Sequence, residues 1–194
     1  MMARDLTLTT ALVTNNNDPD NLGRVKVQYP WSSESEESDW IRISTLMAGA
    51  EQGFYFIPEV EQEVLITFID ADVDSPIVIG ALWNQNDAPP QNNEGGKNDI
   101  RKIRSRSGHE IVFDDGENPK LEIKTPSGQM ILLDDTSGSE KIKIEDASGT
   151  SIELDASAQA IKISSGMDIS IEATNITLKA SGELVLKGGM VRIN

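Results

Sequence analysis

The C-terminal part of this sequence repeats pairs of apolar residues in which a single residue separates the two partners. The pairs begin 8, 7, 8 and 7 residues apart. Because side chains alternate between the two faces of a strand, each pair predicts a short strand with two apolar side chains on one face. Short strands at a fixed period are typical of a solenoid. The pairs are Ile161/Ile163, Ile169/Ile171, Ile176/Leu178, Leu184/Leu186 and Val191/Ile193.

A longer repeat precedes these pairs. Three Ser-Gly steps are each followed by an apolar run, and their glycines, Gly108, Gly128 and Gly149, lie 20 and 21 residues apart. The residues between the apolar pairs are mostly small or polar, as tight corners require. We therefore expect residues 100–194 to form one structure of stacked strands.

Charge and aromatic content divide the chain into two parts. Residues 1–90 contain 4 Lys and Arg against 15 Asp and Glu, a net charge of −11, whereas residues 91–194 contain 13 against 17, a net charge of −4. All three Trp, both Tyr and three of the four Phe precede residue 84. We expect these aromatic side chains to fill the core of a compact first domain, and a narrow aliphatic interior in the second.

The first part reads as five or six short strands, with almost no helical periodicity, which predicts a small barrel. Pro-Pro and Gly-Gly steps then indicate a linker. The predicted fold is all-β, with a barrel at 1–84, a linker at 85–99 and a spike-like β-structure at 100–194. The expected strands of the barrel are 6–13, 24–29, 40–44, 54–57, 63–69 and 76–81.

Composition excludes several classes of function. The chain has no Cys and a single His, so disulfides, thiolate metal sites and His-dependent catalysis have almost no residues to use. A net charge of −15 argues against a nucleic-acid partner. No apolar stretch approaches the length of a membrane span, and the N-terminus lacks the apolar region of a secretory signal.

Two arrangements fit the stacked strands. A single-chain coil needs roughly 20 residues or more per turn and would leave both ends as exposed edges. Three intertwined chains would pair every strand above and below, and would share one apolar axis. We therefore predict a homotrimeric β-prism in which folding and assembly are inseparable. The predicted axial core is Ile161, Ile163, Ile169, Ile171, Ile176, Leu178, Leu184, Leu186, Val191 and Ile193.

Several motifs resemble a known family. Residues 17–27, 40–43, 53–66 and 77–84 resemble the OB-fold domain of phage baseplate spikes and of the VgrG spikes of type VI secretion. Residues 107–115 are similar to the element that opens the triple-stranded β-helix in that family. The likeness extends from about residue 10 to the end of the sequence, with the motifs in the same order.

The resemblance implies the central spike of a contractile injection machine: a phage tail, a type VI apparatus or an extracellular particle. Such a spike is made in the cytoplasm, assembled without a signal peptide, and driven through a target membrane. The 194 residues contain no counterpart of the VgrG hub domains, so we expect a hub protein at the OB end or a longer parent protein. The resemblance also implies a neck at Ser107, Gly108 and His109.

The C-terminal end lacks the His-x-His motif that binds iron at the apex of some spikes. An open prism end implies a separate PAAR-like tip protein, contacting Met190, Val191, Arg192, Ile193 and Asn194. We expect no catalytic residue, metal or cofactor.

Asp70, Asp72 and Asp74 have the spacing that opens a calcium loop, but Ser75 and Ala81 stand where that loop needs Gly and Glu. The rival functions are a receptor-binding tail fibre, which shares trimeric prisms, and a single-chain β-helix enzyme acting on polysaccharides.

Overall fold

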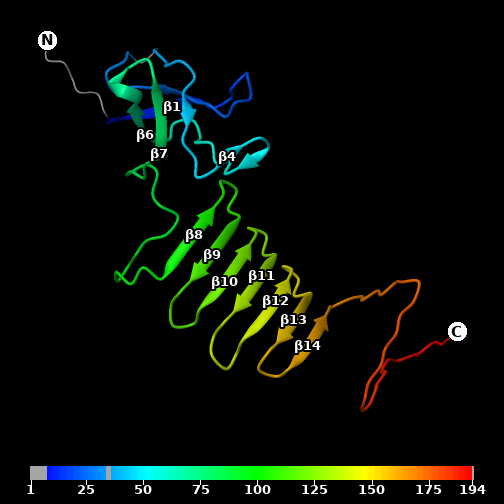
Figure 1. Cartoon of the computed structure of the whole chain (residues 1–194). Coiled ribbons are helices and arrows are strands. Elements are labelled where there is room, and N and C mark those ends of the chain that lie inside the picture. The colour runs from blue at the N-terminus through cyan, green and yellow to red at the C-terminus, as the bar shows by residue number, and fades with distance from the viewer. Residues whose placement is uncertain (1–7, 34–35, 194) are drawn as a thin grey trace, which may run out of the picture. The chain divides into compact units, whose positions relative to one another are not determined.

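The computed structural model describes residues 8–33 and 36–193. The chain forms two compact units, Met1–Asn92 and Asn93–Asn194, each of which is described by itself. Every regular element in the described residues is a strand, apart from one short 3₁₀ turn at Ile69–Ala71 (Figure 1). This confirms the all-β prediction, and none of the described residues forms a helix long and apolar enough to cross a membrane.

The first unit is a five-stranded barrel with the strand order β2-β1-β6-β7-β3. Val25 and Ile41, which lie just before β2 and β3, close it through two backbone hydrogen bonds of 3.0 and 2.8 Å. A separate two-stranded hairpin, β4–β5, lies between β3 and β6 in the chain. The strands are β1 (Leu8–Asn15), β2 (Lys26–Gln28), β3 (Arg42–Ile43), β4 (Ala48–Gly49), β5 (Gln52–Gly53), β6 (Glu63–Phe68) and β7 (Pro76–Ala81).

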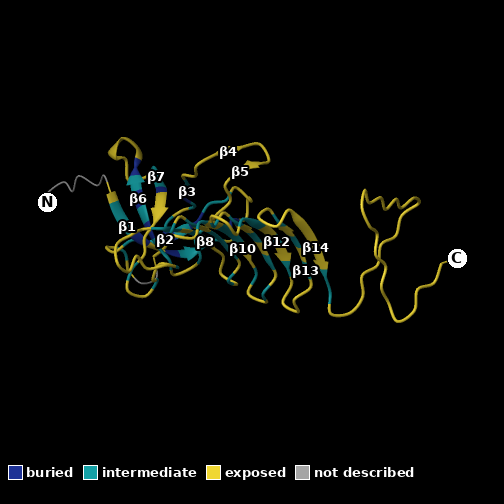
Figure 2. Cartoon of the chain, turned by 90° about the horizontal axis from the view of Figure 1, so that it is seen from below, coloured by how far each residue is buried: buried dark blue, intermediate teal, exposed yellow. Residues whose placement is uncertain are grey.

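The interior of the barrel is aliphatic. Along β6, Val64, Ile66 and Phe68 point inward and are buried, while the residues between them are half-buried, as alternation along a strand requires. The buried residues appear dark blue in Figure 2. They are Ala11, Val13, Val25, Val27, Ile41, Val64, Ile66, Phe68 and Val78.

The expectation that aromatic residues fill this core is wrong. Phe68 is the one buried aromatic among the described residues. A five-stranded barrel is narrow, and its β-branched side chains already fill it. Trp31, Trp83 and Tyr55 are exposed instead.

The expected strand at 54–57 is also absent. This segment follows the β4–β5 hairpin, and only its first residue continues the hairpin pairing, with the Phe54 amide donating to the Met47 carbonyl at 3.1 Å. Alternation of apolar residues alone does not provide a partner strand.

The second unit contains a seven-stranded antiparallel sheet in which each strand pairs with the next one along the chain. Each strand has five residues, not the three expected from the apolar pairs. The domain boundaries at 84, 85 and 99 stay a prediction. The strands are β8 (Ile100–Arg104), β9 (Glu110–Asp114), β10 (Lys120–Lys124), β11 (Met130–Asp134), β12 (Lys141–Glu145), β13 (Ser151–Asp155) and β14 (Ala160–Ser164).

Candidate functional site: an apolar assembly surface

One face of the second sheet carries two continuous columns of side chains. Residues two apart on a strand share a face, and the register places them directly opposite their equivalents on the next strand. One column consists entirely of isoleucine: Ile103, Ile111, Ile123, Ile131, Ile144, Ile152 and Ile163. The other is Arg101, Phe113, Leu121, Leu133, Ile142, Leu154 and Ile161.

This apolar face is uncovered in a single chain. Most of its isoleucines and leucines are exposed, and an open groove follows the column that runs from Phe113 to Ile161. Figure 2 shows β8–β14 in teal and yellow, without the dark blue of the barrel core. Covering one such side chain is worth about 1.5–3 kcal/mol. A ladder of this size therefore strongly favours a partner surface.

The opposite face carries one column of charges that alternate in sign from strand to strand. Asp114, Lys120, Asp134, Lys141 and Asp155 are successive register partners along one column. Hydrogen bonds from Thr136, helped by Lys141 and Lys120, hold the pKa of the Asp134 carboxyl below its ordinary value. This face is the one suited to water.

Lys143, Glu153 and Lys162 are direct register partners on the face opposite the isoleucines. Their outward orientation in a trimer stays a prediction. The closest ion pair of Lys143 is with Glu145 on its own strand, at 2.9 Å.

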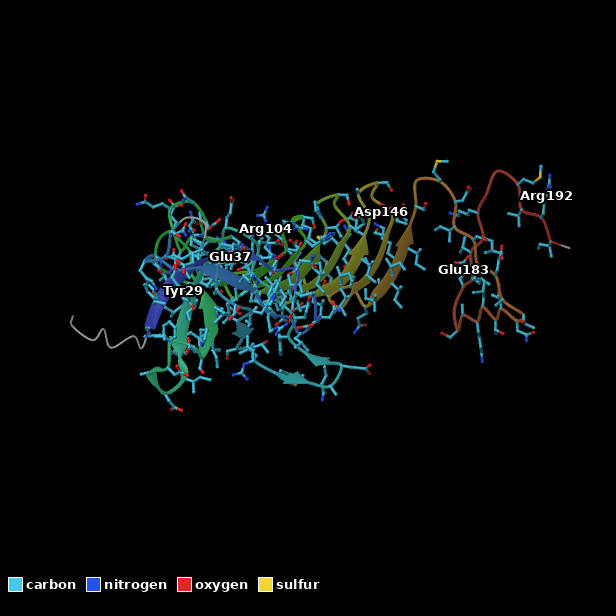
Figure 3. The ribbon with its side chains drawn as sticks, turned by 90° about the horizontal axis from the view of Figure 1, so that it is seen from above. Tyr29, Glu37, Arg104, Asp146, Glu183 and Arg192 are labelled. Atoms are coloured by element: carbon cyan, nitrogen blue, oxygen red, sulfur yellow. The ribbon has the colours of Figure 1, made fainter. Side chains whose placement is uncertain are left out.

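The Ser-Gly repeats form the turns that connect β8 to β9, β10 to β11 and β12 to β13, at one end of the strands. In each turn the glycine has a positive φ, 89° at Gly108, 97° at Gly128 and 87° at Gly149, and its amide donates to the carbonyl three residues earlier. Asp146 anchors the third turn by accepting hydrogen bonds from the amides of Ser148 and Thr150 at 2.8 and 2.9 Å (Figure 3). Each repeat of 20 or 21 residues thus corresponds to one hairpin of two strands.

The predicted neck residues lie in the first of these turns. Ser107, Gly108 and His109 connect β8 to β9, and the His109 amide donates to the Ser105 hydroxyl at 3.1 Å. Their role as a neck stays a prediction.

Strand pairing over residues 100–164 differs from the expected exchange between three chains. All six pairings from β8 to β14 are made within one chain. The five-residue turns, such as 105–109, give room for the chain to return antiparallel to itself, so no neighbour is needed for backbone pairing. The single-chain coil is not formed either, because the seven strands lie in one open sheet.

Residues 165–193 behave differently, since none of them belongs to a strand. The apolar pairs from Ile169 to Ile193 are exposed, and Figure 3 shows Glu183 and Arg192 on a ribbon that runs without a neighbouring strand of the sheet. Ile161 and Ile163 are the members of the predicted axial core that lie in the sheet, on β14. Strand β14 itself has one unpaired edge.

The predicted tip residues Met190, Val191, Arg192 and Ile193 are exposed, and Asn194 lies outside the described residues. No group of three or more potential metal-ligating His, Asp or Glu side chains occurs in the described part of the chain. In the candidate calcium loop, Asp72 accepts hydrogen bonds from the Asp74 amide and the Ser75 hydroxyl, at 3.1 and 3.0 Å, as in an ordinary polar turn.

Comparison with known families matches both units. Residues 9–83 match the family described as the type VI secretion system/phage-baseplate injector OB domain. Residues 120–194 match the phage baseplate V C-terminal trimerisation domain. The second match includes both the apolar sheet from β10 onward and the segment that has no strand.

Curated relatives match over 75 residues. The chain is 41% identical there to the type VI secretion system spike protein VgrG2a of Pseudomonas aeruginosa, over 37% of this chain and 9% of that protein. It is 39% identical to the spike protein VgrG3 of Vibrio cholerae, over 37% of this chain and 7% of that protein. The same values hold for the actin cross-linking toxin VgrG1 of Vibrio cholerae. The match therefore spans less than a tenth of each of these relatives.

Proposed function

This chain belongs to the family of VgrG and phage-baseplate spikes, and from that premise we propose that it is the central puncturing spike of a contractile injection machine. The observation that carries the proposal is the uncovered isoleucine ladder of β8–β14, continued by the exposed apolar pairs of residues 165–193. A monomer would leave both in water. Three copies would cover them on a common axis.

The sheet supports this assembly because one of its faces is charged and the other is apolar. Its charged face carries ion pairs between neighbouring strands, including Lys102–Glu110 at 3.4 Å. Its apolar face has no partner within the described residues of the unit. Three such faces turned inward would make a dry triangular core with a water-compatible exterior.

The segment 165–193 supports intertwining at the C-terminal end. Buried backbone amides and carbonyls need hydrogen-bond partners, and this segment forms no strand of its own. Neighbouring copies would supply these partners and bring Ile169, Ile171, Ile176, Leu178, Leu184, Leu186, Val191 and Ile193 to the axis. Continuous interchain pairing would also give the stiffness that puncturing requires.

The proposed partners follow from the two ends. The OB barrel would face a baseplate hub protein, and a PAAR-like protein would cap Met190–Ile193 at the tip. The spike would be made in the cytoplasm, built into a virion tail or injection particle, and delivered outside the cell through a target membrane. The names of the relatives, spike proteins of type VI secretion, support delivery by such a machine.

We further propose that the chain acts mechanically and has no active site. One relative is named for actin cross-linking, but the matched 75 residues are 7% of that protein. The proposal is supported by the composition, which offers a single His and no Cys, and by the described residues, among which no group of three or more potential metal ligands occurs.

The test is the Ile171→Asp variant compared with Ser170→Asp. In the proposed trimer Ile171 would point to the axis, so the variant would place three carboxylates together in an apolar column and block assembly. In the short strand that residues 169–171 would form in the assembled prism, Ser170 would lie on the other face, so its variant should still assemble. We expect light scattering to give about three times 21.2 kDa for the parent and for Ser170→Asp, and the monomer mass for Ile171→Asp.

If the unsubstituted protein has the monomer mass, the proposed trimeric spike is refuted. A trimer of Ile171→Asp that resists SDS would refute the axial role of this residue while leaving the trimer intact.

A further inference from the structure

The two ends of strand β11 carry different polar side chains, Gln129 before it and Asp135 after it. Backbone pairing continues for one residue past the strand at each end. The Thr125 amide donates to the Gln129 carbonyl at 3.0 Å, and the Asp135 amide donates to the Pro119 carbonyl at 2.9 Å. Because the alternation of side chains continues with the pairing, both polar side chains lie on the apolar face. The isoleucine and leucine of β11 are thus flanked by an amide on one side and a carboxylate on the other.

The repeat places the same chemistry on β9. His109 follows the turn glycine before β9 and Asp115 follows the strand, so the spacing of six residues equals that on β11. Pairing also extends past this strand, with the Ser105 amide donating to the His109 carbonyl at 2.9 Å. Before β13, Thr150 is a third donor, but Ala156 replaces the carboxylate. The arrangement of a donor and a carboxylate is therefore confined to β9 and β11.

The polar groups at the ends of β11 are incompletely paired in one chain. The Gln129 side-chain oxygen accepts hydrogen bonds from the hydroxyls of Thr125 and Ser127, which leaves its NH₂ group to donate elsewhere. Within the part of the chain that the structure describes, neither this NH₂ group nor the Asp135 carboxylate has a hydrogen-bond or ion-pair partner. Both side chains are exposed. Covered by a second protein surface, such groups would need partners.

Cyclic symmetry determines which ends of the sheets meet. In a closed ring of three copies every contact is head-to-tail. If the apolar faces turn to a common axis, the Gln129 end of each sheet meets the Asp135 end of the next sheet. Equivalent strands of the three copies lie at one level along the axis, so the donor of β11 in one copy faces the carboxylate of β11 in its neighbour.

The level of β12 carries carboxylates at both ends, and these are held within their own turns. Glu140 accepts a hydrogen bond from the Gly138 amide at 3.0 Å. Asp146 accepts hydrogen bonds from the amides of Ser148 and Thr150. This level offers no donor to a neighbouring copy, so the attraction would come from β9 and β11.

We propose that the Gln129 NH₂ group of one copy donates to the Asp135 carboxylate of the next copy, and that the His109 imidazole meets Asp115 in the same way on β9. The inference rests on the proposed trimer. Asp115 already pairs with Arg101 of its own chain, so on β9 the carboxylate would bridge two copies. These polar pairs would form the corners of the prism and fix which strands lie level.

Paired cysteines test the contact, because the chain has none of its own. In Gln129→Cys/Asp135→Cys, the two positions are separated by six residues of extended chain, about 20 Å. A disulfide requires α-carbons within roughly 7 Å, so it can form only between copies, and three disulfides would close a covalent trimer. The control is Gln129→Cys/Asp115→Cys, in which the two positions differ in level by two strands, roughly 10 Å.

Both variants are first shown by light scattering to have the trimer mass, and are then oxidised mildly. Electrophoresis in SDS without reductant should show about tenfold more covalent trimer for Gln129→Cys/Asp135→Cys than for the control, because only its cysteines would lie within disulfide reach. Equal amounts in the two variants, or no covalent trimer in either, would overturn the corner pairing and leave the spike intact. A monomer mass for the unsubstituted protein would instead remove the spike proposal.

A charge substitution tests the same contact should the cysteine variants fail to assemble. In Gln129→Glu, the side chain can still accept the hydroxyls of Thr125 and Ser127, but in the trimer it would place a carboxylate against Asp135. We expect a smaller fraction of trimer at a fixed protein concentration, since like charges repel across an interface. Gln129→Glu/Asp135→Lys should restore that fraction. A trimer fraction that stays low in the double variant, or never falls in Gln129→Glu, would overturn the inference.

Discussion

Asp18 shows how one side chain can hold a loop that has no regular structure. Its carboxylate accepts hydrogen bonds from the backbone amides of Asp20, Leu22 and Arg24, at 3.1, 3.0 and 3.2 Å, and from the Arg24 guanidinium at 2.9 and 2.7 Å. The side chain is 4% exposed. The Arg24 guanidinium, supported by the three amides, holds the pKa of the Asp18 carboxyl well below its ordinary value.

The first prediction is that Asp18→Asn lowers the thermal midpoint of the barrel by several degrees at neutral pH. Because the pKa of Asp18 is depressed by folding, its contribution is present above the unfolded pKa of about 3.9 and is lost as the pH falls below it. The difference in midpoint between the parent and the variant should therefore shrink in acid. Tryptophan fluorescence of the barrel measures both midpoints.

Asp20→Asn is the matched control for this prediction. Asp20 pairs with the same Arg24 at 2.6 Å, but its side chain is 67% exposed. Exposed ion pairs contribute little to stability, so this variant should behave like the parent. Equal losses for the two variants would contradict a special role for the buried carboxylate.

At the scale of elements, the sequence predicts faces better than partners. Alternation fixes which side chains of β8–β14 share a face, and that prediction is correct for Ile161 and Ile163. Alternation does not fix which strand pairs with which, because pairing also depends on the number of residues that connect two strands.

The spacing of the apolar pairs along the sequence indicates where the connection is long enough for a hairpin turn. Seven residues lie between Ile103 and Ile111, enough for a hairpin turn between two five-residue strands, whereas four lie between Ile171 and Ile176. The change in spacing coincides with the end of the single-chain sheet at Ser164.

The second prediction concerns the glycine turns. Gly149 has φ 87° with open space around its α-carbon, so Gly149→Ala tests backbone conformation alone. An L-residue in the left-handed region costs roughly 1–2 kcal/mol. In Gly128→Ala, the added methyl group would also lie 3.3 Å from the Ala147 β-carbon, so we expect a larger loss. Urea denaturation followed by far-UV circular dichroism measures both.

Gly182→Ala is the control, because Gly182 has open space and no positive φ. Its substitution should leave the denaturation midpoint nearly unchanged. If Gly149→Ala has no greater effect than Gly182→Ala, the turn conformation does not limit the stability of the sheet.

At the scale of the whole molecule, the two units obtain their cores from different sources. The barrel closes on itself and buries nine apolar residues within one chain, including Val64 and Ile66. The second unit has no buried residue among those described. The stability of the barrel should therefore be a property of the chain, whereas that of the second unit should depend on protein concentration through assembly.

The third prediction uses the positions of the tryptophan residues in the sequence. Trp31, Trp40 and Trp83 all lie in the first unit, so tryptophan fluorescence reports on the barrel, whereas far-UV circular dichroism reports on both units. In Ile171→Asp at monomer mass, we expect the fluorescence transition to persist and most of the dichroism amplitude of the second unit to disappear.

Dilution of the parent protein separates the same two sources of stability without a substitution. Lowering the protein concentration should lower the midpoint of the dichroism transition of the second unit, because its core exists only between copies. The fluorescence midpoint should move far less, since the Val and Ile core of the barrel is complete in one chain. If dichroism keeps its full amplitude in the monomeric variant, the isoleucine ladder is stable in water on its own, and trimerisation is not what folds the second unit.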